Sequence, residues 1–127
     1  MEKSQKKSQI GKIGEENACQ FLIKRGYKVL KRNYWKKFGE IDIIARANDG
    51  TIVFIEVKTL LIKNGGGFTP EDNLTTQKLR NVKRMAEFFA AEHEELVNEE
   101  MGWRIDLVAV EFFEPEGEFM VRHYKNI

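Results

Sequence analysis

Two neighbouring segments near the middle of the chain carry the dense aliphatic and β-branched pattern of buried strands. They cover residues 39–46 and 51–59, and the turn-forming residues 47–50 between them end in Asp-Gly. Two such runs joined by a short connection that contains glycine predict a β-hairpin. Because side chains along a strand alternate between its two faces, Glu56 and Lys58 must project together on one face of this hairpin.

The register of the hairpin decides whether a second acid joins Glu56. A three-residue loop over residues 48–50 pairs Asp42 with Glu56 and places their β-carbons about 5 Å apart on one face. A two-residue turn at Asp49 and Gly50 would instead put the two carboxylates on opposite faces. Facing acids repel each other unless a cation or a proton compensates, whereas two carboxylates beside a lysine can hold a divalent metal ion and activate a water. A shared metal site therefore predicts an odd-numbered loop or a bulge here.

Two further segments show apolar residues at helical spacing. The first covers residues 10–22, and Gly26 is placed to end this helix in a left-handed conformation. The second begins near residue 75 and runs to about residue 97. Glu15 and Glu16 lie on opposite flanks of the first apolar stripe, so periodicity alone does not choose which of them reaches along the sheet.

Two more strands are predicted after the second helix, at residues 104–110 and 118–124. With one strand before the hairpin, the order is helix, three strands, helix, two strands (αβββαββ). This order favours an α/β fold, a three-layer sandwich in which helices flank a mixed central β-sheet. Asp106 lies two residues after Arg104 on the same strand face, so we predict a structural ion pair there rather than a further metal ligand.

The composition fits one soluble domain over residues 10–127, preceded by a flexible basic arm over residues 1–9. A chain of 127 residues, 42% of them hydrophobic and 32% charged, can bury roughly two thirds of its unfolded surface. Cys19 is the single cysteine, which excludes an internal disulfide and is compatible with a reducing cytoplasm. We expect a cytoplasmic protein without membrane insertion, because neither a signal-peptide pattern nor an apolar run near eighteen residues occurs.

The formal net charge of +1 conceals a strong asymmetry along the chain. Residues 1–37 carry 11 Lys or Arg and 3 acids, whereas residues 85–118 carry 1 Arg and 11 acids. A basic N-terminal third can attract phosphate groups even when the whole chain is nearly neutral. Arg32, Lys36 and Lys37 are therefore candidate nucleic-acid contacts.

Other aromatic and basic residues are further candidates for contacts with nucleic acid. Tyr34 and Trp35 interleave with the basic residues and can either stack on exposed bases or pack into the core, and packing is the favoured interpretation. Lys78, in the basic first half of the second helix, is a further candidate phosphate contact, although solvated surface charge is the usual role of such a residue. Residues 60–74 contain three consecutive glycines and predict a long loop, either a flap that grips substrate or a simple connector.

A specific resemblance runs through nearly the whole chain. The residues that carry it are Gly14-Glu15, Ala18, Gly26-Tyr27, Asn33, Gly39-Glu40-Ile41-Asp42-Ile43-Ile44 and Phe54-Ile55-Glu56-Val57-Lys58. In these positions the chain resembles the small bacterial YraN-like proteins, uncharacterised protein family 0102. That family is similar to the PD-(D/E)XK nuclease superfamily and to archaeal Holliday-junction resolvases, in which a helix glutamate, an aspartate and an acid-x-lysine triplet bind magnesium and cut phosphodiesters. The resemblance implies a restriction-endonuclease-like fold.

By this resemblance the catalytic positions are Glu15, Asp42, Glu56 and Lys58. The expected metal ligands are Asp42, Glu56 and the Val57 carbonyl, with Glu15 acting directly or through water. A ligand set made only of oxygen favours Mg²⁺ or Mn²⁺ over zinc. The family usually has arginine two residues after the lysine, and this chain has leucine there.

The function that follows as an expectation is a metal-dependent endonuclease that hydrolyses phosphodiester bonds in DNA. The resolvase likeness implies branched or junction DNA and, because a symmetric junction needs two cutting sites, a homodimer. One alternative is a non-catalytic nucleic-acid-binding module on a nuclease scaffold, motivated by Leu60 and the modest net charge. Another is a protein-interaction domain that uses the acidic second helix.

Overall fold

The computed structural model describes residues 2–63, 75–114 and 117–127, and their order of elements is the predicted αβββαββ. The elements are α1 (Glu2–Lys24), β1 (Lys28–Lys36), β2 (Gly39–Arg46), β3 (Ile52–Lys63), α2 (Thr76–Glu92), a short 3-10 turn η2 (Glu94–Leu96), β4 (Trp103–Glu114) and β5 (Glu118–Tyr124). The segment for which the sequence predicts a flap lies, from residue 64 onward, outside the described residues.

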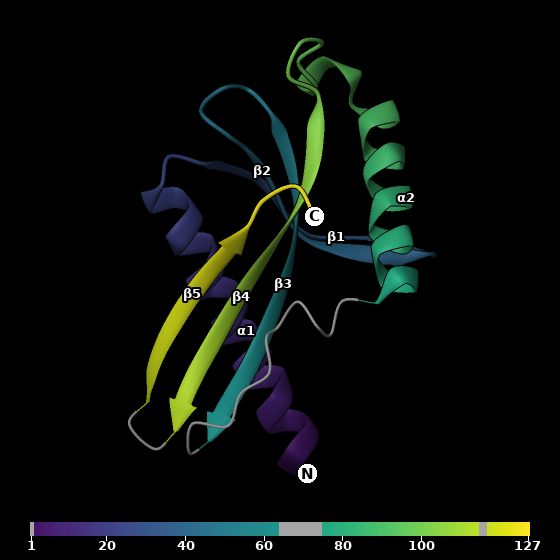
Figure 1. Ribbon diagram of the computed structural model, residues 1–127. Helices are drawn as coiled ribbons and strands as arrows, with labels where there is room; N and C mark the ends of the chain where they lie inside the picture. Colours follow the sequence, from purple (N-terminus) through teal and green to yellow (C-terminus); the bar gives the residue numbers. More distant parts are fainter. Residues whose placement is uncertain (1, 64–74, 115–116) are drawn as a thin grey trace.

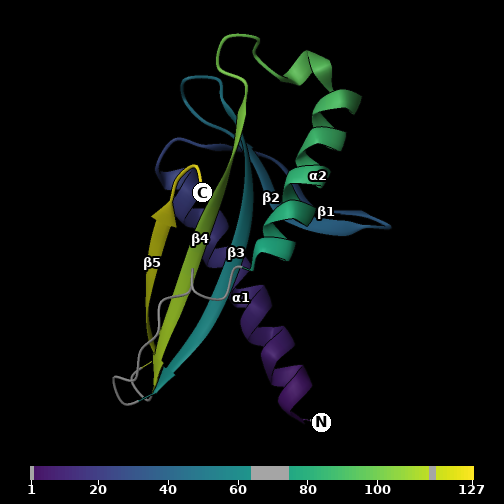
Figure 2. The same cartoon turned by 45° about the vertical axis from the view of Figure 1, so that its right-hand side comes forward.

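One sheet contains all five strands in the order β1-β2-β3-β4-β5. Only β3 and β4 are parallel among its pairs, so the sheet is mixed. A parallel pair needs a long crossover connection, and α2 lies within it. Figures 1 and 2 show α1 and α2 on opposite sides of the sheet, which confirms the predicted three-layer α/β sandwich.

A hydrophobic core lies on each face of the sheet because neighbouring strand residues point in opposite directions. Ile43 and Ile55 pack with Ala18 and Leu22 of α1. On the other face lies a second cluster, centred on α2, whose buried members are Tyr34, Ile41, Ile44, Ile52, Phe54, Val82, Met85, Ala86, Phe89 and Ile105. The central strand is therefore covered on both sides, as its nearly continuous apolar sequence predicts.

The β2–β3 connection is the predicted three-residue loop. The amide of Ala47 donates to the carbonyl of Thr51 at 2.9 Å, and the amide of Gly50 donates back to the carbonyl of Ala47 at 3.0 Å. Gly50 has a φ of 95°, a left-handed value that favours glycine at the end of such a loop. The Asp49 carboxylate also accepts hydrogen bonds from the amide and hydroxyl of Thr51, which fixes the loop.

This loop sets the register that matters for the site. The β2–β3 ladder runs from Arg46 opposite Ile52 to Ile43 opposite Ile55, the register in which Asp42 and Glu56 are the next residues of the two strands. The predicted register is therefore confirmed.

The residues of β2 that precede Ile43 pair with β1 only. This pairing continues to Gly39, which lies opposite Lys36. Asn33 falls opposite Asp42 and has a φ of 52°, a left-handed value that asparagine tolerates better than most residues. The β1–β2 ribbon thus leaves the plane of the sheet and extends past α2 in Figure 1. The departure opens a gap between β2 and β3 at Asp42.

The ends of the two helices differ in part from the sequence expectations. Helix α1 begins at Glu2 rather than near residue 10, because residues 2–9 are mostly Lys, Gln, Glu and Ser, without proline or glycine to interrupt a helix. The division into an arm over residues 1–9 and a domain over residues 10–127 stays a prediction. The predicted cap at Gly26 is present: its φ is 91°, and the amide of Tyr27 donates to the carbonyl of Leu22 at 3.0 Å.

Helix α2 ends at Glu92 rather than near residue 97. His93 leaves the helical conformation with a φ of −129° and a ψ of 53°, and η2 follows directly. The apolar residues Leu96 and Val97, which prolong the helical pattern in the sequence, pack against the α2-side core from this turn instead. Neither described helix is long and apolar enough to cross a membrane.

Gly14 allows α1 to approach β3 closely, and its replacement by alanine is expected to destabilise the protein by about 1–3 kcal/mol. A β-carbon at this position would lie 2.0 Å from Oγ1 and 3.0 Å from the β-carbon of Thr59, so α1 would have to move. Gly11 is the matched control, because a β-carbon there meets nothing within 4 Å and alanine should stabilise the helix by up to about 1 kcal/mol. Urea unfolding of Gly14→Ala and Gly11→Ala measures both effects, and equal stabilisation by the two would contradict the close contact.

Candidate active site at the β2–β3 gap

A cleft of about 570 Å³ lies where β2 separates from β3. It brings together the four predicted catalytic residues and one predicted phosphate contact. Its charged lining residues are Glu15, Asp42, Glu56, Lys58 and Lys78. They come from α1, β2, β3 and α2, so the cleft exists only in the folded chain.

Asp42 is the most strongly perturbed acid of the cleft. Its Oδ2 atom accepts a hydrogen bond from the Val57 amide at 2.8 Å. Burial, together with the negative charges of Glu56, Glu15 and Glu40, raises the pKa of Asp42 to about 8, against the opposing effect of the Val57 amide. A carboxyl in this environment binds a proton or a cation near neutral pH.

Three carboxylates converge around this position. Glu15, Glu40 and Asp42 each offer an oxygen, and these oxygens all lie within 4.8 Å of one another. Oxygen ligands at such spacing suit a hard divalent cation, which would offset the negative charges that add to burial in raising the pKa of Asp42. The chemistry of this donor set therefore fits magnesium or manganese.

Glu40 is a member of the group that the sequence analysis missed. It precedes Asp42 by two residues on the same strand and therefore shares its face, which is a signal that the sequence did contain. The family resemblance assigned a role only to the aspartate of this strand. Glu40 lines a second depression, of about 480 Å³, which shares Glu15, Asp42, Glu56 and Lys78 with the first cleft.

Glu56 is held by a lysine rather than grouped with the other three acids. Its side chain is only 9% exposed, and its Oε1 atom lies 2.7 Å from Nζ of Lys78. This ion pair connects β3 to the first turns of α2 and offsets the buried charge of Glu56. The predicted role of Lys78 as a phosphate contact and that of Glu56 as a metal ligand both stay predictions.

Lys58 lies on the same face of β3 as Glu56 and lines the cleft, partly buried. Leu60 lines the cleft as well. The cleft wall is therefore apolar at the position where the resembling family usually has arginine. Val57 donates its amide to Asp42, and the expected role of its carbonyl as a ligand stays a prediction.

The other predicted nucleic-acid contacts lie elsewhere. Arg32 donates to Glu16 at 2.8 Å, across the space between β1 and α1. Lys36 lies 3.8 Å from Glu92 of α2, and Lys37 is exposed in the β1–β2 turn. None of these three basic residues is among those that line the cleft in the described part of the chain.

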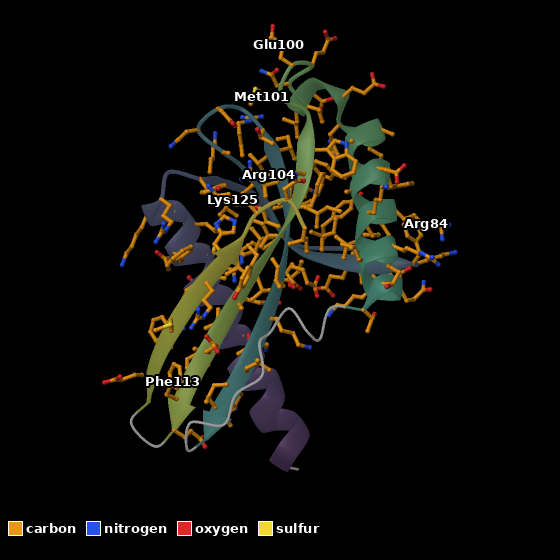
Figure 3. The ribbon with its side chains drawn as sticks, in the orientation of Figure 1. Arg84, Glu100, Met101, Arg104, Phe113 and Lys125 are labelled. Carbon is orange, nitrogen blue, oxygen red and sulfur yellow. The ribbon has the colours of Figure 1, made fainter. Side chains whose placement is uncertain are left out.

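Asp106 belongs to a separate buried network. It is fully buried and interacts with Nε of Arg104 at 3.0 Å, Nε2 of His123 at 2.7 Å and the amide of Asn126 at 2.9 Å. These contacts hold the pKa of Asp106 below its usual value despite burial. The predicted structural ion pair with Arg104 is confirmed, and Figure 3 shows Arg104 near Lys125, which follows β5.

The sheet between two helical layers and the acid-lined gap between β2 and β3 define the protein as a three-layer α/β protein with a candidate metal site. Comparison with known proteins then places it more narrowly. The model of uncharacterised protein family UPF0102 matches residues 14–110, and the chain belongs to this family. A UPF0102 protein of Thermotoga petrophila is 42% identical over 118 residues, which cover 91% of this chain and 94% of the relative.

Solved structures show more distant similarity. A repair endonuclease from Pyrococcus abyssi is 22% identical, with a TM-score of 0.46 over 87% of this chain and 39% of that protein. The structure of an EndoMS complex with double-stranded DNA is 18% identical, with a TM-score of 0.42 over 72% of this chain and 34% of that one. This chain therefore spans less than half the length of either protein, and its own strand order and layers define its fold.

Proposed function

We propose that this protein is a metal-dependent endonuclease that hydrolyses phosphodiester bonds in DNA. The observation that carries the proposal is the convergence of three carboxylates, Glu15, Glu40 and Asp42, two of which line the cleft that also contains Lys58. Three clustered carboxylates repel one another, and this repulsion is costly for a domain that has no cation to place there. The match of this site to the acid-x-lysine pattern of the resembling nucleases supports the same reaction.

The residues that would hold the cation are Glu15, Glu40 and Asp42. When bound, Mg²⁺ or Mn²⁺ supplies Lewis-acid polarisation of the phosphoryl group and lowers the pKa of a bound water. Asp42 is fixed for this role through its hydrogen bond from the Val57 amide.

Lys58 has the complementary role in this proposal. It orients the attacking water and offsets the negative charge that develops on the phosphate in the transition state. Glu56 and Lys78 support the arrangement through their 2.7 Å ion pair, which fixes the α2 side of the cleft. The basic start of α2, with Lys78 and Arg80, attracts the phosphate backbone toward the cleft.

A cleavage panel tests this function. Purified protein is incubated with single-stranded, duplex, flap and four-way DNA in Mg²⁺, Mn²⁺, Ca²⁺ or EDTA, and products are resolved by gel electrophoresis. We expect cleavage with Mg²⁺ or Mn²⁺ and none with EDTA. Binding that is salt-dependent but indifferent to the cation, without cleavage of any substrate, would instead identify a non-catalytic binding module, which the apolar cleft wall at Leu60 favours.

Glu40→Gln is expected to weaken Mn²⁺ or Mg²⁺ binding about tenfold or more, because it removes one of the three clustered carboxylates. Glu56→Gln should weaken it less, since Glu56 is occupied by Lys78. Isothermal titration calorimetry measures both, with the exposed Glu87→Gln of α2 as a control that should bind as the wild type does. A larger loss with Glu56→Gln than with Glu40→Gln would restore Glu56 as the principal ligand.

A further inference from the structure

Two neighbouring aromatic residues of β1 have opposite environments. Tyr34 is 7% exposed and packs edge-on against Phe89 in the α2-side core, with its hydroxyl donating to Glu92 at 2.9 Å. Trp35 is 66% exposed, the most exposed of the large hydrophobic side chains in the described residues. The packing interpretation that the sequence favours for both residues holds for Tyr34 alone. An indole left in water at the end of a strand ribbon needs another explanation.

The position of Trp35 connects it to the candidate active site. In the β1–β2 ladder Trp35 lies directly opposite Glu40, so their side chains share one face with β-carbons about 5 Å apart. Glu40 is one of the three clustered carboxylates. In a nucleotide, a single sugar connects the base to its phosphate. When the phosphate lies in the cleft, the base of that nucleotide is therefore within reach of the Trp35 indole.

The end of the β1–β2 ribbon is also suited to a phosphate backbone. The guanidinium of Arg84 lies 4.5 Å from the ring centre of Phe38, and Nζ of Lys36 lies 5.3 Å from that of Phe88. Lys37 is exposed in the turn between β1 and β2. Figure 3 shows Arg84 on the outer side of α2, the side on which Figure 1 shows the end of the ribbon. Lys36 and Arg84 lie on the α2 side of the ribbon, the face opposite to that of Trp35, and Lys37 lies in the turn that joins the two faces. Cations near an exposed aromatic side chain are the combination that binds single-stranded nucleic acids.

We propose that Trp35 is a stacking platform for an unpaired nucleobase, and that the substrates of this protein carry unpaired nucleotides next to the cleaved bond. Single strands and flaps belong to this class. Bases inside a duplex are already stacked on their neighbours and cannot offer a face to the indole without being extruded. The proposal deepens the proposed function and relies on it for the cleavage position, although base stacking itself can be measured without cleavage.

Trp35 fluorescence provides a direct test. The chain contains two tryptophans, so Trp103→Phe leaves Trp35 as the single indole. Trp103 contacts Phe54 edge-on in the core, which makes phenylalanine a conservative replacement. In EDTA, single-stranded oligothymidylate should quench and shift the emission of this variant, whereas a blunt duplex of equal length should have little effect. If Trp103→Phe does not fold, as judged by circular dichroism, the difference between wild type and Trp35→Phe gives the same signal.

Affinity provides the second measurement. Trp35→Ala should weaken binding of the same oligothymidylate about 5- to 100-fold, and Trp35→Phe should retain part of the affinity, because one base stack is worth about 1–3 kcal/mol. Phe119→Ala is the matched control, since Phe119 of β5 is 51% exposed and lies in a strand at the opposite edge of the sheet. This variant should bind as the wild type does.

The outcomes separate this inference from the proposed function. Quenching and affinity loss without any cleavage by the wild type would refute the nuclease and leave the stacking platform intact. Unchanged emission together with equal affinity of Trp35→Ala would overturn the inference, even if the protein cuts DNA. Self-association of the wild type in sedimentation without DNA, lost in Trp35→Ala, would also overturn it by identifying the exposed indole as a contact between two copies of the chain.

Discussion

Asp42→Asn is expected to reduce metal-dependent cleavage at least about 100-fold while the protein stays folded. Asp42 is the acid that both accepts the Val57 amide and belongs to the cluster with Glu15 and Glu40. Asparagine keeps the shape and an acceptor oxygen, but it removes the negative charge that attracts the cation. A bound metal ion contributes several kcal/mol to transition-state stabilisation, which corresponds to this loss of rate.

Initial rates on the best substrate of the cleavage panel measure this effect at saturating Mg²⁺. Glu100→Gln is the control, because Glu100 is exposed at the far end of the molecule in Figure 3 and should leave the rate unchanged. Circular dichroism and thermal unfolding establish that both variants are folded. Cleavage by Asp42→Asn at the wild-type rate would mean that the activity belongs to another site or to a contaminant.

The metal-free protein is expected to lose stability as the pH rises from about 4 to about 8. The pKa of Asp42 is raised from 3.8 to about 8 in the folded state, chiefly by burial and then by Glu56. A folded state that holds a proton more tightly than the unfolded chain is favoured at low pH. Its contribution is complete below the unfolded pKa and disappears as the pH passes the folded pKa. The loss for this one group is at most about 6 kcal/mol, from a shift of about four pKa units at 1.36 kcal/mol each.

Asp42→Asn isolates this contribution, because an amide does not titrate. Urea unfolding in EDTA between pH 5 and pH 9 should show a smaller decline for the variant than for the wild type, so that the variant becomes the more stable of the two at pH 9. Added Mg²⁺ should stabilise the wild type more at pH 9 than at pH 6, where a proton competes for the same oxygens. Parallel stability curves for the two proteins across this range would show that Asp42 is not protonated in the folded state.

Local signals in the sequence were sufficient for much of the architecture. The Asn48–Gly50 loop fixed the register of β2 and β3, and with it the position of Asp42 opposite Glu56, because hairpin geometry depends on a few neighbouring residues. The left-handed cap at Gly26 is equally local. The ion pair of Arg104 with Asp106 followed from two-residue alternation along one strand. The order of helices and strands followed from periodicity.

The details of the site depend on contacts that no local pattern contains. The ion pair of Glu56 with Lys78 joins β3 to a helix far along the chain, so its presence depends on where α2 is packed. Two-residue alternation along β2 places Glu40 on the face of Asp42, but the approach of both to Glu15 depends on where α1 is packed. Tyr34 is buried in the α2-side core, so for a similar reason the sequence did not separate it from exposed Trp35.

The parallel pairing of β3 with β4 has a consequence for how the chain folds. Strands β1 to β3 are joined by short connections and can form as an antiparallel meander early, whereas Phe54 meets its neighbour Ile105 only after the whole crossover has closed. Until then the apolar edge of β3 is open to pairing with other chains. Recombinant production should therefore give the best yield of monomer when synthesis is slow and refolding is carried out in dilute solution.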